Sequence, residues 1–271
     1  MAGFFALYMK RASREQELAS MSTPLDSILS WLDQTLQPGS FRDYCPNGLQ
    51  VEGKAEVVKL ATGVTANQAV LDKAIDWGAD ALLVHHGYFW KGEAAPVVGM
   101  KRNRLAALLS HDVSLLAYHL PLDAHPTLGN NARLGQLLGI AAVAPLQPED
   151  PYSVGNVGEL EVSAGTLCDK LRALTGRDPM LIGDRERTLK RVAWCTGAAQ
   201  SYIDAAVVAG ADVFITGEIS EQTVHVAREE GIAFIAAGHH ATERYGVQAV
   251  GEALARKFSL EHRFFDEDNP V

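Results

Sequence analysis

The chain has 271 residues, of which 47% are hydrophobic and 21% charged, as is ordinary for a globular protein with one large α/β domain or two modest ones. Its formal net charge of −9 argues against a nucleic-acid-binding protein of the usual basic kind. Small anionic substrates stay compatible with that charge, because a bound metal reverses the local potential. The three cysteines, Cys45, Cys168 and Cys195, form no closely spaced pair. This pattern predicts a reduced, cytoplasmic protein without a disulfide framework or a thiolate zinc site.

The N-terminal segment does not predict a membrane span. Gly3 to Met9 is apolar but too short to cross a bilayer. It also lacks the preceding basic residues and the small-residue cleavage site of a signal peptide. We expect residues 1–20 to be a disordered extension or to precede the native start, with a short amphipathic anchor as the alternative.

Residues 21–145 are predicted to form a first α/β half. Helical periodicity alternates there with short apolar runs typical of buried strands. Helices are expected at 25–36, 66–77, 102–110 and 133–138, and strands at 57–62, 81–84 and 113–118. Proline and glycine then accumulate over 141–157, which we interpret as the join to a second half.

Residues 146–271 are predicted to form a second, similar half. Strands are expected at 213–216 and 232–236, and helices at 221–230 and 242–258. Gly210-Ala211-Asp212 stands before one of these strands as Gly78-Ala79-Asp80 stands before the strand at 81–84. This match indicates an internal duplication, although helix–glycine–strand junctions are common and one match also arises by chance. We therefore predict two interlinked α/β halves with mainly parallel sheets, the C-terminal part packing back on the first half.

Histidines and carboxylates follow the predicted strands at the points where these end. The residues concerned are His85, His86, His119, Asp123, Glu218, His239 and Glu243. In largely parallel sheets, ligands bind beyond the carboxyl ends of the strands. Imidazole and carboxylate together suit iron, zinc, manganese or nickel. A single histidine there is more often a hydrogen-bonded core or rim residue, so the prediction of a metal site rests on the convergence of several strand ends.

The spacing of these residues favours two ions over one. Adjacent residues of a strand point to opposite sides, so His85 and His86 do not easily face a single ion. Asp123 is the expected bridging carboxylate. His239 and Glu243 share one face if the following helix already includes His239. His119 and Glu218 are interpreted either as proton-transfer groups or as residues that orient the ligands by hydrogen bonds.

Five segments, in order along the chain, resemble the motifs of a known family. They are Asn47-Gly48-Leu49-Gln50, Val84-His85-His86-Gly87, Tyr118-His119-Leu120-Pro121-Leu122-Asp123, Thr216-Gly217-Glu218 and Gly238-His239-His240-Ala241-Thr242-Glu243. The family is the YbgI-type or NGG-interacting-factor-three-like family, whose members are also called GTP cyclohydrolase I type 2 homologues. The resemblance covers the chain from about Met21 to its end. The extra N-terminal segment is the departure from the family pattern.

The resemblance implies a dinuclear centre and an assembly. It places two divalent metal ions per subunit at His85, His86, Asp123, His239 and Glu243, and it implies ring-shaped homohexamers whose ions face an internal cavity. The family name implies a hydrolase that acts on a nucleotide or related heterocycle, with His119 or Glu218 transferring protons. The alternative is a non-catalytic metal-binding, metal-delivery or regulatory scaffold, so whether the protein is an enzyme stays open. A small-molecule substrate or ligand is possible. Membrane or nucleic-acid partners are not expected.

Overall fold

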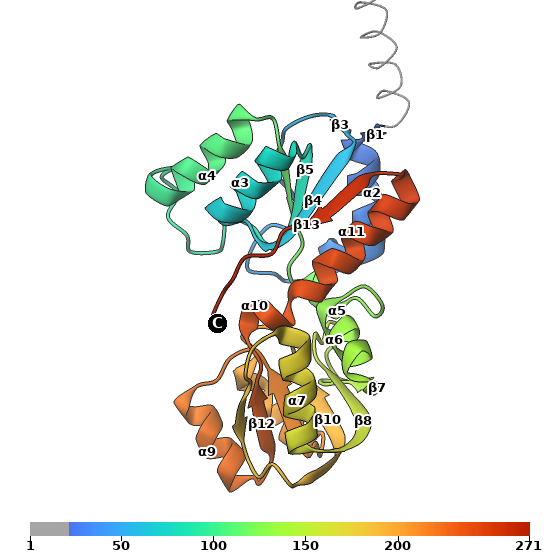
Figure 1. The fold of residues 1–271 in the computed structure, drawn as a ribbon, viewed down its shortest axis with the longest axis vertical. Coiled ribbons are helices and arrows are strands. Elements are labelled where there is room, and N and C mark those ends of the chain that lie inside the picture. Colours follow the sequence, from blue (N-terminus) through green and yellow to red (C-terminus); the bar gives the residue numbers. More distant parts are fainter. Residues whose placement is uncertain (1–21) are drawn as a thin grey trace, which may run out of the picture.

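The computed structural model describes residues 22–271, so the extension expected at residues 1–20 lies outside the described residues. Figure 1 shows two lobes that meet at a narrow waist, each built around one sheet. Across residues 22–271, none of the helices has the length and apolar character that crossing a membrane requires.

A five-stranded sheet with the order β13-β4-β5-β6-β2 forms the centre of the first lobe. Its strands are β2 (Gly48–Val51), β4 (Lys59–Thr65), β5 (Ala81–His86), β6 (Ser114–Ala117) and β13 (Glu261–Phe264). All neighbouring pairs are parallel except β2 with β6. Helices α2 (Leu25–Leu36) and α11 (Arg244–Phe258) supply the core on one face, and α3 (Gln68–Trp77) and α4 (Gly99–Ser110) supply it on the other. A small ladder of β1 (Thr23–Pro24) and β3 (Glu56–Val57) lies beside this sheet.

A six-stranded sheet with the order β7-β8-β10-β11-β12-β9 forms the second lobe. Its strands are β7 (Ala141–Pro145), β8 (Asn156–Ser163), β9 (Met180–Ile182), β10 (Thr188–Trp194), β11 (Val213–Thr216) and β12 (Ala233–Ala236). Helices α6 (Asn130–Leu138) and α7 (Ala164–Thr175) pack on one face, and α8 (Ile203–Val208) and α9 (Glu221–Glu229) pack on the other. The short elements are η1 (Pro38–Ser40), α5 (Leu120–Ala124), η2 (Gln200–Tyr202) and α10 (His239–Thr242).

The α/β fold class is confirmed, and the second sheet adds a feature that the sequence pattern did not show. Only β10 with β11 and β11 with β12 are parallel there, whereas β7, β8 and β9 pair antiparallel with their neighbours. Residues 141–157, interpreted as a join, contain β7 and the start of β8. β7 lies at the edge of the sheet, where its terminal Pro145 is tolerated because an edge strand leaves one row of backbone groups unpaired.

The end of the chain leaves the second lobe and returns to the first. β13 pairs in parallel with β4, and α11 packs over β4 and β5. Val247, Val250 and Leu254 of α11 are buried in the same cluster as Leu60 of β4. Because α10 immediately precedes α11, the packing of α11 fixes α10 at the waist (Figure 1).

The two Gly-Ala-Asp segments make the same contacts in the two lobes. Asp80 Oδ2 accepts hydrogen bonds of 2.9 Å from the backbone amides of Val58 and Lys59. Asp212 Oδ2 accepts hydrogen bonds of 2.8 and 2.9 Å from the backbone amides of Lys190 and Arg191 in β10. In both lobes the aspartate therefore ties the start of a parallel strand to its neighbour.

Replacing Asp80 by alanine should destabilise the first lobe. The change leaves the two amides that bond Oδ2 without an acceptor and removes the 2.6 Å ion pair with Lys54. We expect the free energy of unfolding to fall by about 1–3 kcal/mol, measured by urea denaturation. Asp72→Ala is the control, because its carboxylate accepts only an exposed side-chain hydrogen bond from Gln68. Equal losses in the two variants would contradict this role of Asp80.

Candidate metal centre

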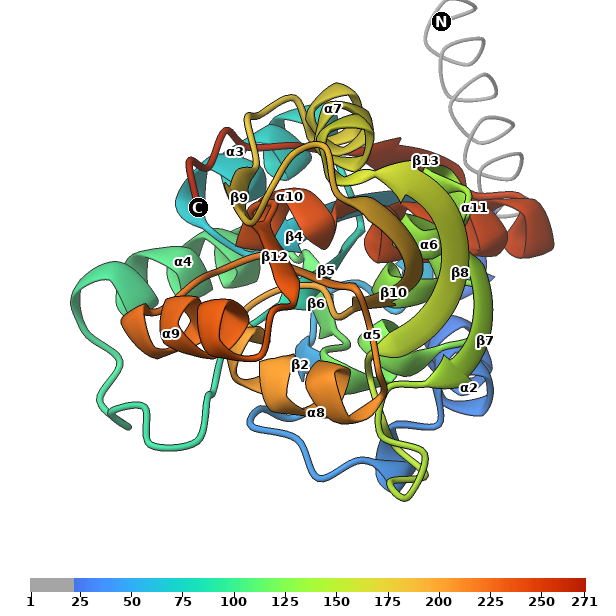
Figure 2. The same ribbon diagram turned by 90° about the horizontal axis from the view of Figure 1, so that it is seen from below.

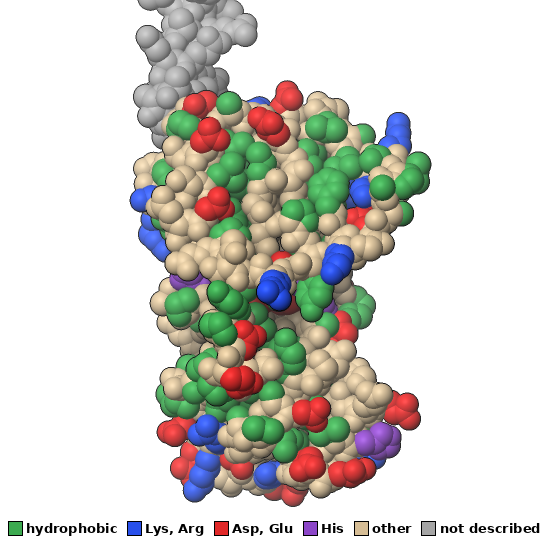
Figure 3. Space-filling model, turned by 180° about the vertical axis from the view of Figure 1, so that it is seen from behind, with side chains coloured by type: hydrophobic (Ala, Val, Ile, Leu, Met, Phe, Trp, Pro, Cys, Tyr) green, Lys and Arg blue, Asp and Glu red, His purple; other side chains and the backbone are tan. Residues whose placement is uncertain are grey.

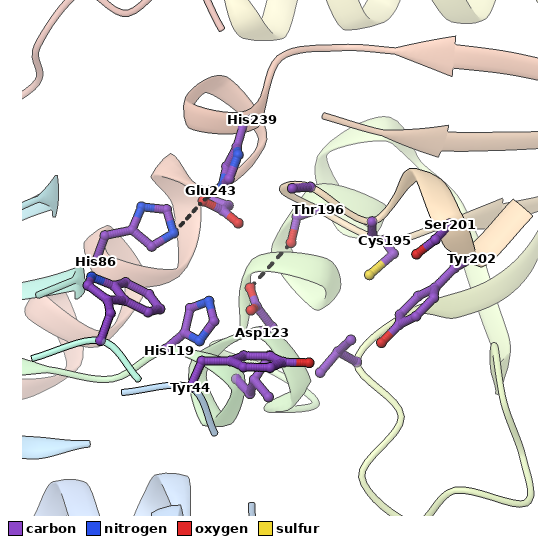
Figure 4. A pocket seen from close by; sticks show the side chains of 15 residues that line it. Tyr44, His86, His119, Asp123, Cys195, Thr196, Ser201, Tyr202, His239 and Glu243 are labelled. Atoms are coloured by element: carbon purple, nitrogen blue, oxygen red, sulfur yellow. Dashed lines mark hydrogen bonds and ion pairs between the residues drawn. The ribbon is translucent and has the colours of Figure 1, made fainter. Parts of the chain in front are cut away.

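The side chains predicted from the strand ends converge at the waist. His85 and His86 lie at the end of β5, and Asp123 lies on α5, the short helix that follows β6. His239 opens α10, and Glu243 stands at the break between α10 and α11. Figure 4 shows His86, Asp123, His239 and Glu243 pointing toward one space between the lobes.

Among the described residues, four sets of three ligand-type side chains are compact enough to hold an ion, and two of these sets contain Glu243. The two sets without it are His85, His86 and His119, and Asp43, Cys45 and His119. Of the two sets with Glu243, the first is His85, Asp123 and Glu243, and the second is His86, His239 and Glu243. In both of these sets the nitrogen and oxygen atoms lie within 4.8 Å of one another, which is compact enough to hold a metal ion.

Glu243 is the residue that connects the two sets. Its Oε1 lies 3.4 Å from His85 Nε2, while its Oε2 lies 3.3 Å from His86 Nε2 and 3.2 Å from His239 Nε2. Asp123 Oδ1 faces only the first set, 3.6 Å from His85 Nε2. In this geometry Glu243, and not Asp123, is the carboxylate common to these two sets, and the bridging role of Asp123 stays a prediction.

Each imidazole is anchored through Nδ1 so that Nε2 points inward. His85 Nδ1 donates to the carbonyl oxygen of Tyr118 at 3.0 Å, and His239 Nδ1 donates to Glu218 Oε1 at 2.7 Å. His86 Nδ1 lies 3.1 Å from the hydroxyl of Thr65. Because the carbonyl and carboxylate oxygens only accept, the Nδ1 atoms of His85 and His239 carry the hydrogen. In the neutral ring, Nε2 is then the atom free to bind a cation.

The contacts between the two sets leave buried polar atoms without partners. Among residues 22–271, His85 Nε2 and Glu243 Oε2 are buried and make no hydrogen bond. Their nearest ligand-type neighbours lie 3.2 to 3.6 Å away. Two atoms that ligate one ion at about 2.1 Å in a tetrahedral arrangement lie roughly 3.4 Å apart. Buried polar atoms normally have partners, so the residues present fit a bound cation.

The directions of the pKa shifts indicate that the cluster lacks positive charge to balance its carboxylates. Burial lowers the pKa of His85, but the carboxylates of Asp123 and Glu243 outweigh burial and raise it to about 9. For His239, too, the lowering by burial is outweighed, here by Glu243 and Glu218, and the pKa rises to about 9. Burial, reinforced by the neighbouring imidazoles, lowers the pKa of His86 to about 3. In the metal-free protein, protons on His85 and His239 thus neutralise the carboxylates, and a bound cation would replace them.

The two carboxylates differ in their surroundings. Burial raises the pKa of Asp123 above its usual value, even though Asn130 donates a 2.8 Å hydrogen bond to its Oδ1. Burial also favours the neutral form of Glu243, but the imidazoles of His86 and His85 outweigh it and hold its pKa well below the usual value. The surroundings of Glu243 therefore favour its charged form, whereas those of Asp123 favour its neutral form.

His119 lies beside the two ligand sets and is held by a residue that the sequence patterns did not indicate. Its Nδ1 donates to Asp43 Oδ1 at 2.7 Å, and its ring lies 5.0 Å from that of His85 between centroids. Asp43 also accepts hydrogen bonds from Asn47 Nδ2 and the backbone amide of Leu120. Asp43 lies in the loop before β2, not at a strand end, so only its proximity to the Asn47 motif was a signal.

Glu218 lies behind His239 rather than in the open space. It accepts the hydrogen bond from His239 Nδ1, and it is not among the residues that line the cavity at the site. This position matches the interpretation of Glu218 as a residue that orients a ligand. His240, next in the chain, points away and contacts Asp266 near the C-terminus at 2.9 Å.

Two glycines make room for α10 and Glu243. A Cβ atom on Gly217 would lie 2.5 Å from the Cα of His239. A Cβ atom on Gly197 would lie 2.0 Å from Glu243 Oε1, and the φ of +75° at Gly197 is itself unfavourable for other residues. The loops after β10 and β11 are therefore shaped to receive the helix that carries the ligands.

A cavity of about 540 Å³ opens from the ligands, within the size range of small-molecule sites. Its wall includes His119, Trp90 and Asp123, together with Tyr44 and Tyr202 at the mouth (Figure 4). Cys195 also lines it, and burial beside Asp123 and Glu243 raises the pKa of that thiol well above its usual value. All three cysteines are buried and free, so the expected absence of a disulfide holds within the described residues.

Asp43 should stabilise the fold in its ionised form. Burial raises its pKa, but hydrogen bonds and charge from His119, Asn47 and Tyr44 outweigh burial and lower the pKa to about 2. A lowered pKa gives stability that is complete above the unfolded value and is lost as the pH falls toward 2. The stability difference between the native protein and Asp43→Asn should therefore be equal at pH 7 and pH 5 and smaller at pH 3, measured by urea denaturation. A difference that is largest at pH 3 would contradict the assignment.

Known proteins resemble this chain over most of its length. The family model described as Duf34/NIF3 (NGG1p interacting factor 3) matches residues 23–270. A Pseudomonas aeruginosa protein named GTP cyclohydrolase 1 type 2 homolog is 53% identical over 253 residues, covering 93% of this chain and 100% of its own. An Escherichia coli K12 protein of the same name is 52% identical, covering 92% of this chain and 99% of its own.

The solved structure of protein ybgI superposes with a TM-score of 0.87 at 49% identity, covering 92% of this chain and 100% of its own. TTHA1606 from Thermus thermophilus gives a TM-score of 0.84 at 34% identity over the same shares. The chain belongs to the Duf34/NIF3 family.

Proposed function

We propose that this protein binds two divalent metal ions per subunit and hydrolyses a nucleotide or a related heterocycle. The observation that carries the proposal is the pair of ligand sets that share Glu243 at the floor of a substrate-sized cavity. The names of the relatives point to the same class of reaction. The ligands proposed for the ions are His85, Asp123 and Glu243 for one, and His86, His239 and Glu243 for the other.

The donor set limits the chemistry of the site. Nitrogen and carboxylate oxygen donors without thiolate suit iron, zinc, manganese or nickel. Divalent ions held there would lower the pKa of water and polarise the bond to be cleaved. Asn130 and Thr196 hold Asp123 Oδ1 at 2.8 and 3.3 Å, which keeps this carboxylate turned toward His85. Glu218 likewise fixes the ring of His239.

His119 is the proposed proton-transfer group. Asp43 accepts its Nδ1 hydrogen, so Nε2 is the atom that can take up or release a proton. Its ring lies 5.0 Å from the ring of Trp90, with which it forms one wall of the cavity. Glu218 is not proposed as a second proton-transfer group, because its carboxylate is engaged behind His239.

The number of ions bound by variants tests the shared role of Glu243. Glu243→Ala removes a donor from both ligand sets and should abolish the binding of both ions, whereas Asp123→Ala should retain one. Metal content per subunit of the reloaded protein, measured by mass spectrometry of the elements, checks this. Glu221→Gln is the control, because its side chain is 91% exposed. Loss of one ion in each of the two site variants would show that Glu243 is not shared.

A methyl group at Gly197 should displace Glu243 and lower the metal content. Gly210→Ala is the matched control, since Gly210 has a similar φ of +68° but no atom within 4 Å of the added Cβ. Both variants should lose comparable stability from backbone strain, measured by thermal unfolding of the metal-free proteins. Only Gly197→Ala should lose metal, so retention of both ions in that variant would contradict the geometry at Glu243.

Turnover of GTP by the metal-loaded protein tests the hydrolase proposal. The native protein should release product, and Asp123→Ala should lose about 100-fold or more of that rate, on the scale of removing an essential electrostatic group. Release of phosphate and loss of the purine absorbance are followed separately. Equal rates in the two proteins would remove this site from the reaction. No turnover in a broad substrate screen, with rapid metal exchange, would favour a metal-binding scaffold.

The ring-shaped homohexamer implied by the family resemblance stays a prediction. Light scattering coupled to size-exclusion chromatography gives the mass of the assembly and decides it.

A further inference from the structure

A second cavity, of about 590 Å³, lies against the metal cavity. The two cavities share four lining residues, Tyr44, Leu120, Val154 and Tyr202. The two cavities therefore adjoin each other along these four side chains. We call the second cavity the aromatic groove, defined by Phe41, Tyr44, Tyr152 and Tyr202.

The walls of the aromatic groove come from both lobes. Phe41 and Tyr44 belong to the segment between η1 and β2, whereas Tyr152 lies between β7 and β8. These two segments run on the same side of the molecule, near α8, in Figure 2. The rings of Phe41 and Tyr152 approach to 5.3 Å between centroids at an angle of 58°. Figure 3 shows the molecule from behind, with hydrophobic side chains gathered at the waist beside a hollow.

These rings are unusually open to solvent for their size. Tyr44 is 61% exposed and Tyr152 is 45% exposed. Exposed rings that line a concave surface offer stacking faces, and stacking on a nucleic-acid base is favourable with any base because each has a π-face. The groove therefore suits a planar ring better than an extended aliphatic chain.

The polar groups of the groove are suited to the edge of a heterocycle. The Arg42 guanidinium and the Gln147 side-chain amide line it, and neither makes a hydrogen bond or ion pair with residues 22–271. Asp150 is the acidic group there, and its Oδ1 accepts a hydrogen bond from the backbone amide of Tyr152 at 2.9 Å. Donors and acceptors are thus both available at one rim, which matches the mixed edge of a nucleobase better than a uniformly anionic group.

We propose that the aromatic groove holds the base of a nucleotide and that the phosphate end of that nucleotide lies at the metal ligands. This inference rests on the proposed function and takes the form of it in which the metal ligands act at the phosphate end of a nucleotide, not the form in which they open the purine ring. The reasons are the shared wall of the two cavities, the four rings that line the aromatic groove and the ligand-type side chains that line the other cavity. The opposite orientation would place a polyanion against Asp150 and leave the stacking faces unused.

Binding by the metal-loaded, full-length protein tests the orientation. The probes are guanosine 5′-monophosphate and ribose 5-phosphate, which differ only in the base, and the affinity is measured by isothermal titration calorimetry. The native protein should bind the nucleotide more tightly than the sugar phosphate. Tyr152→Ala should weaken nucleotide binding roughly tenfold, the effect of losing one stacking partner, and should leave sugar phosphate binding unchanged.

Two variants control for unrelated effects. Tyr152→Phe keeps the ring and should bind both probes as the native protein does. Val208→Ala truncates an apolar side chain that is 89% exposed outside both cavities and should also change nothing. Equal affinity of the native protein for the two probes would overturn the proposal. So would a Tyr152→Ala variant that binds the nucleotide as tightly as the native protein, or that weakens both probes alike.

The outcome separates this inference from the hydrolase proposal. Base-dependent binding that is lost in Tyr152→Ala, together with no turnover of GTP, would leave the groove assignment standing and remove the hydrolase. Turnover of GTP with affinities that do not depend on Tyr152 would leave the hydrolase proposal standing and remove the groove assignment. Where turnover occurs, release of phosphate with an intact purine absorbance supports the orientation, and loss of that absorbance at the metal site overturns it.

Discussion

The burial of one carboxylate, that of Glu243, is the constraint around which this structure is organised. Its two oxygens face three imidazoles at 3.2 to 3.4 Å, and Oε2 has no hydrogen bond within residues 22–271. An isolated buried carboxylate is costly, so the site needs positive charge, either as protons on the imidazoles or as bound cations. The glycines at 197 and 217 leave the space in which this residue and α10 sit. A cation bound at this position would therefore also stabilise the fold.

The two-lobed architecture explains how such a cluster is assembled. His85 and His86 come from the first sheet, and the chain reaches His239 only after completing the second. α11 then packs back on β4 and β5, which holds Glu243 against the histidines of the first lobe. His239 of the second set is reached only through the second lobe. A motion of one lobe against the other would change the separation of ligand atoms, so ions bound across the waist would also stabilise the arrangement of the lobes.

The sequence predicted the site well because the carboxyl ends of parallel strands meet at one edge. That rule placed the two histidines after β5, His119 and Asp123 after β6, and His239 with Glu243 after β12. It did not reveal Asp43, which reaches His119 from a loop 76 positions away along the chain. Nor did it indicate that Glu243 faces three imidazoles, because this depends on the break between α10 and α11 at Glu243, where φ is −103° and ψ is 7°. Loop placement and helix breaks are set by tertiary packing, which periodicity does not encode.

The two lobes are alike at the amino ends of their equivalent strands and differ at the carboxyl ends, where the candidate site lies. At the amino ends of equivalent strands, Asp80 and Asp212 make the same pair of backbone hydrogen bonds. At the carboxyl ends the lobes differ: β5 ends in two ligand-type histidines, whereas β11 leads into a glycine and Glu218, which supports a ligand from α10. The amino end of each of these strands is hydrogen-bonded to its neighbour through the aspartate. The carboxyl end is where side chains suited to binding or catalysis lie. The first lobe thus supplies the pair of histidines, and the second lobe supports α10. The aromatic groove forms where the two lobes meet.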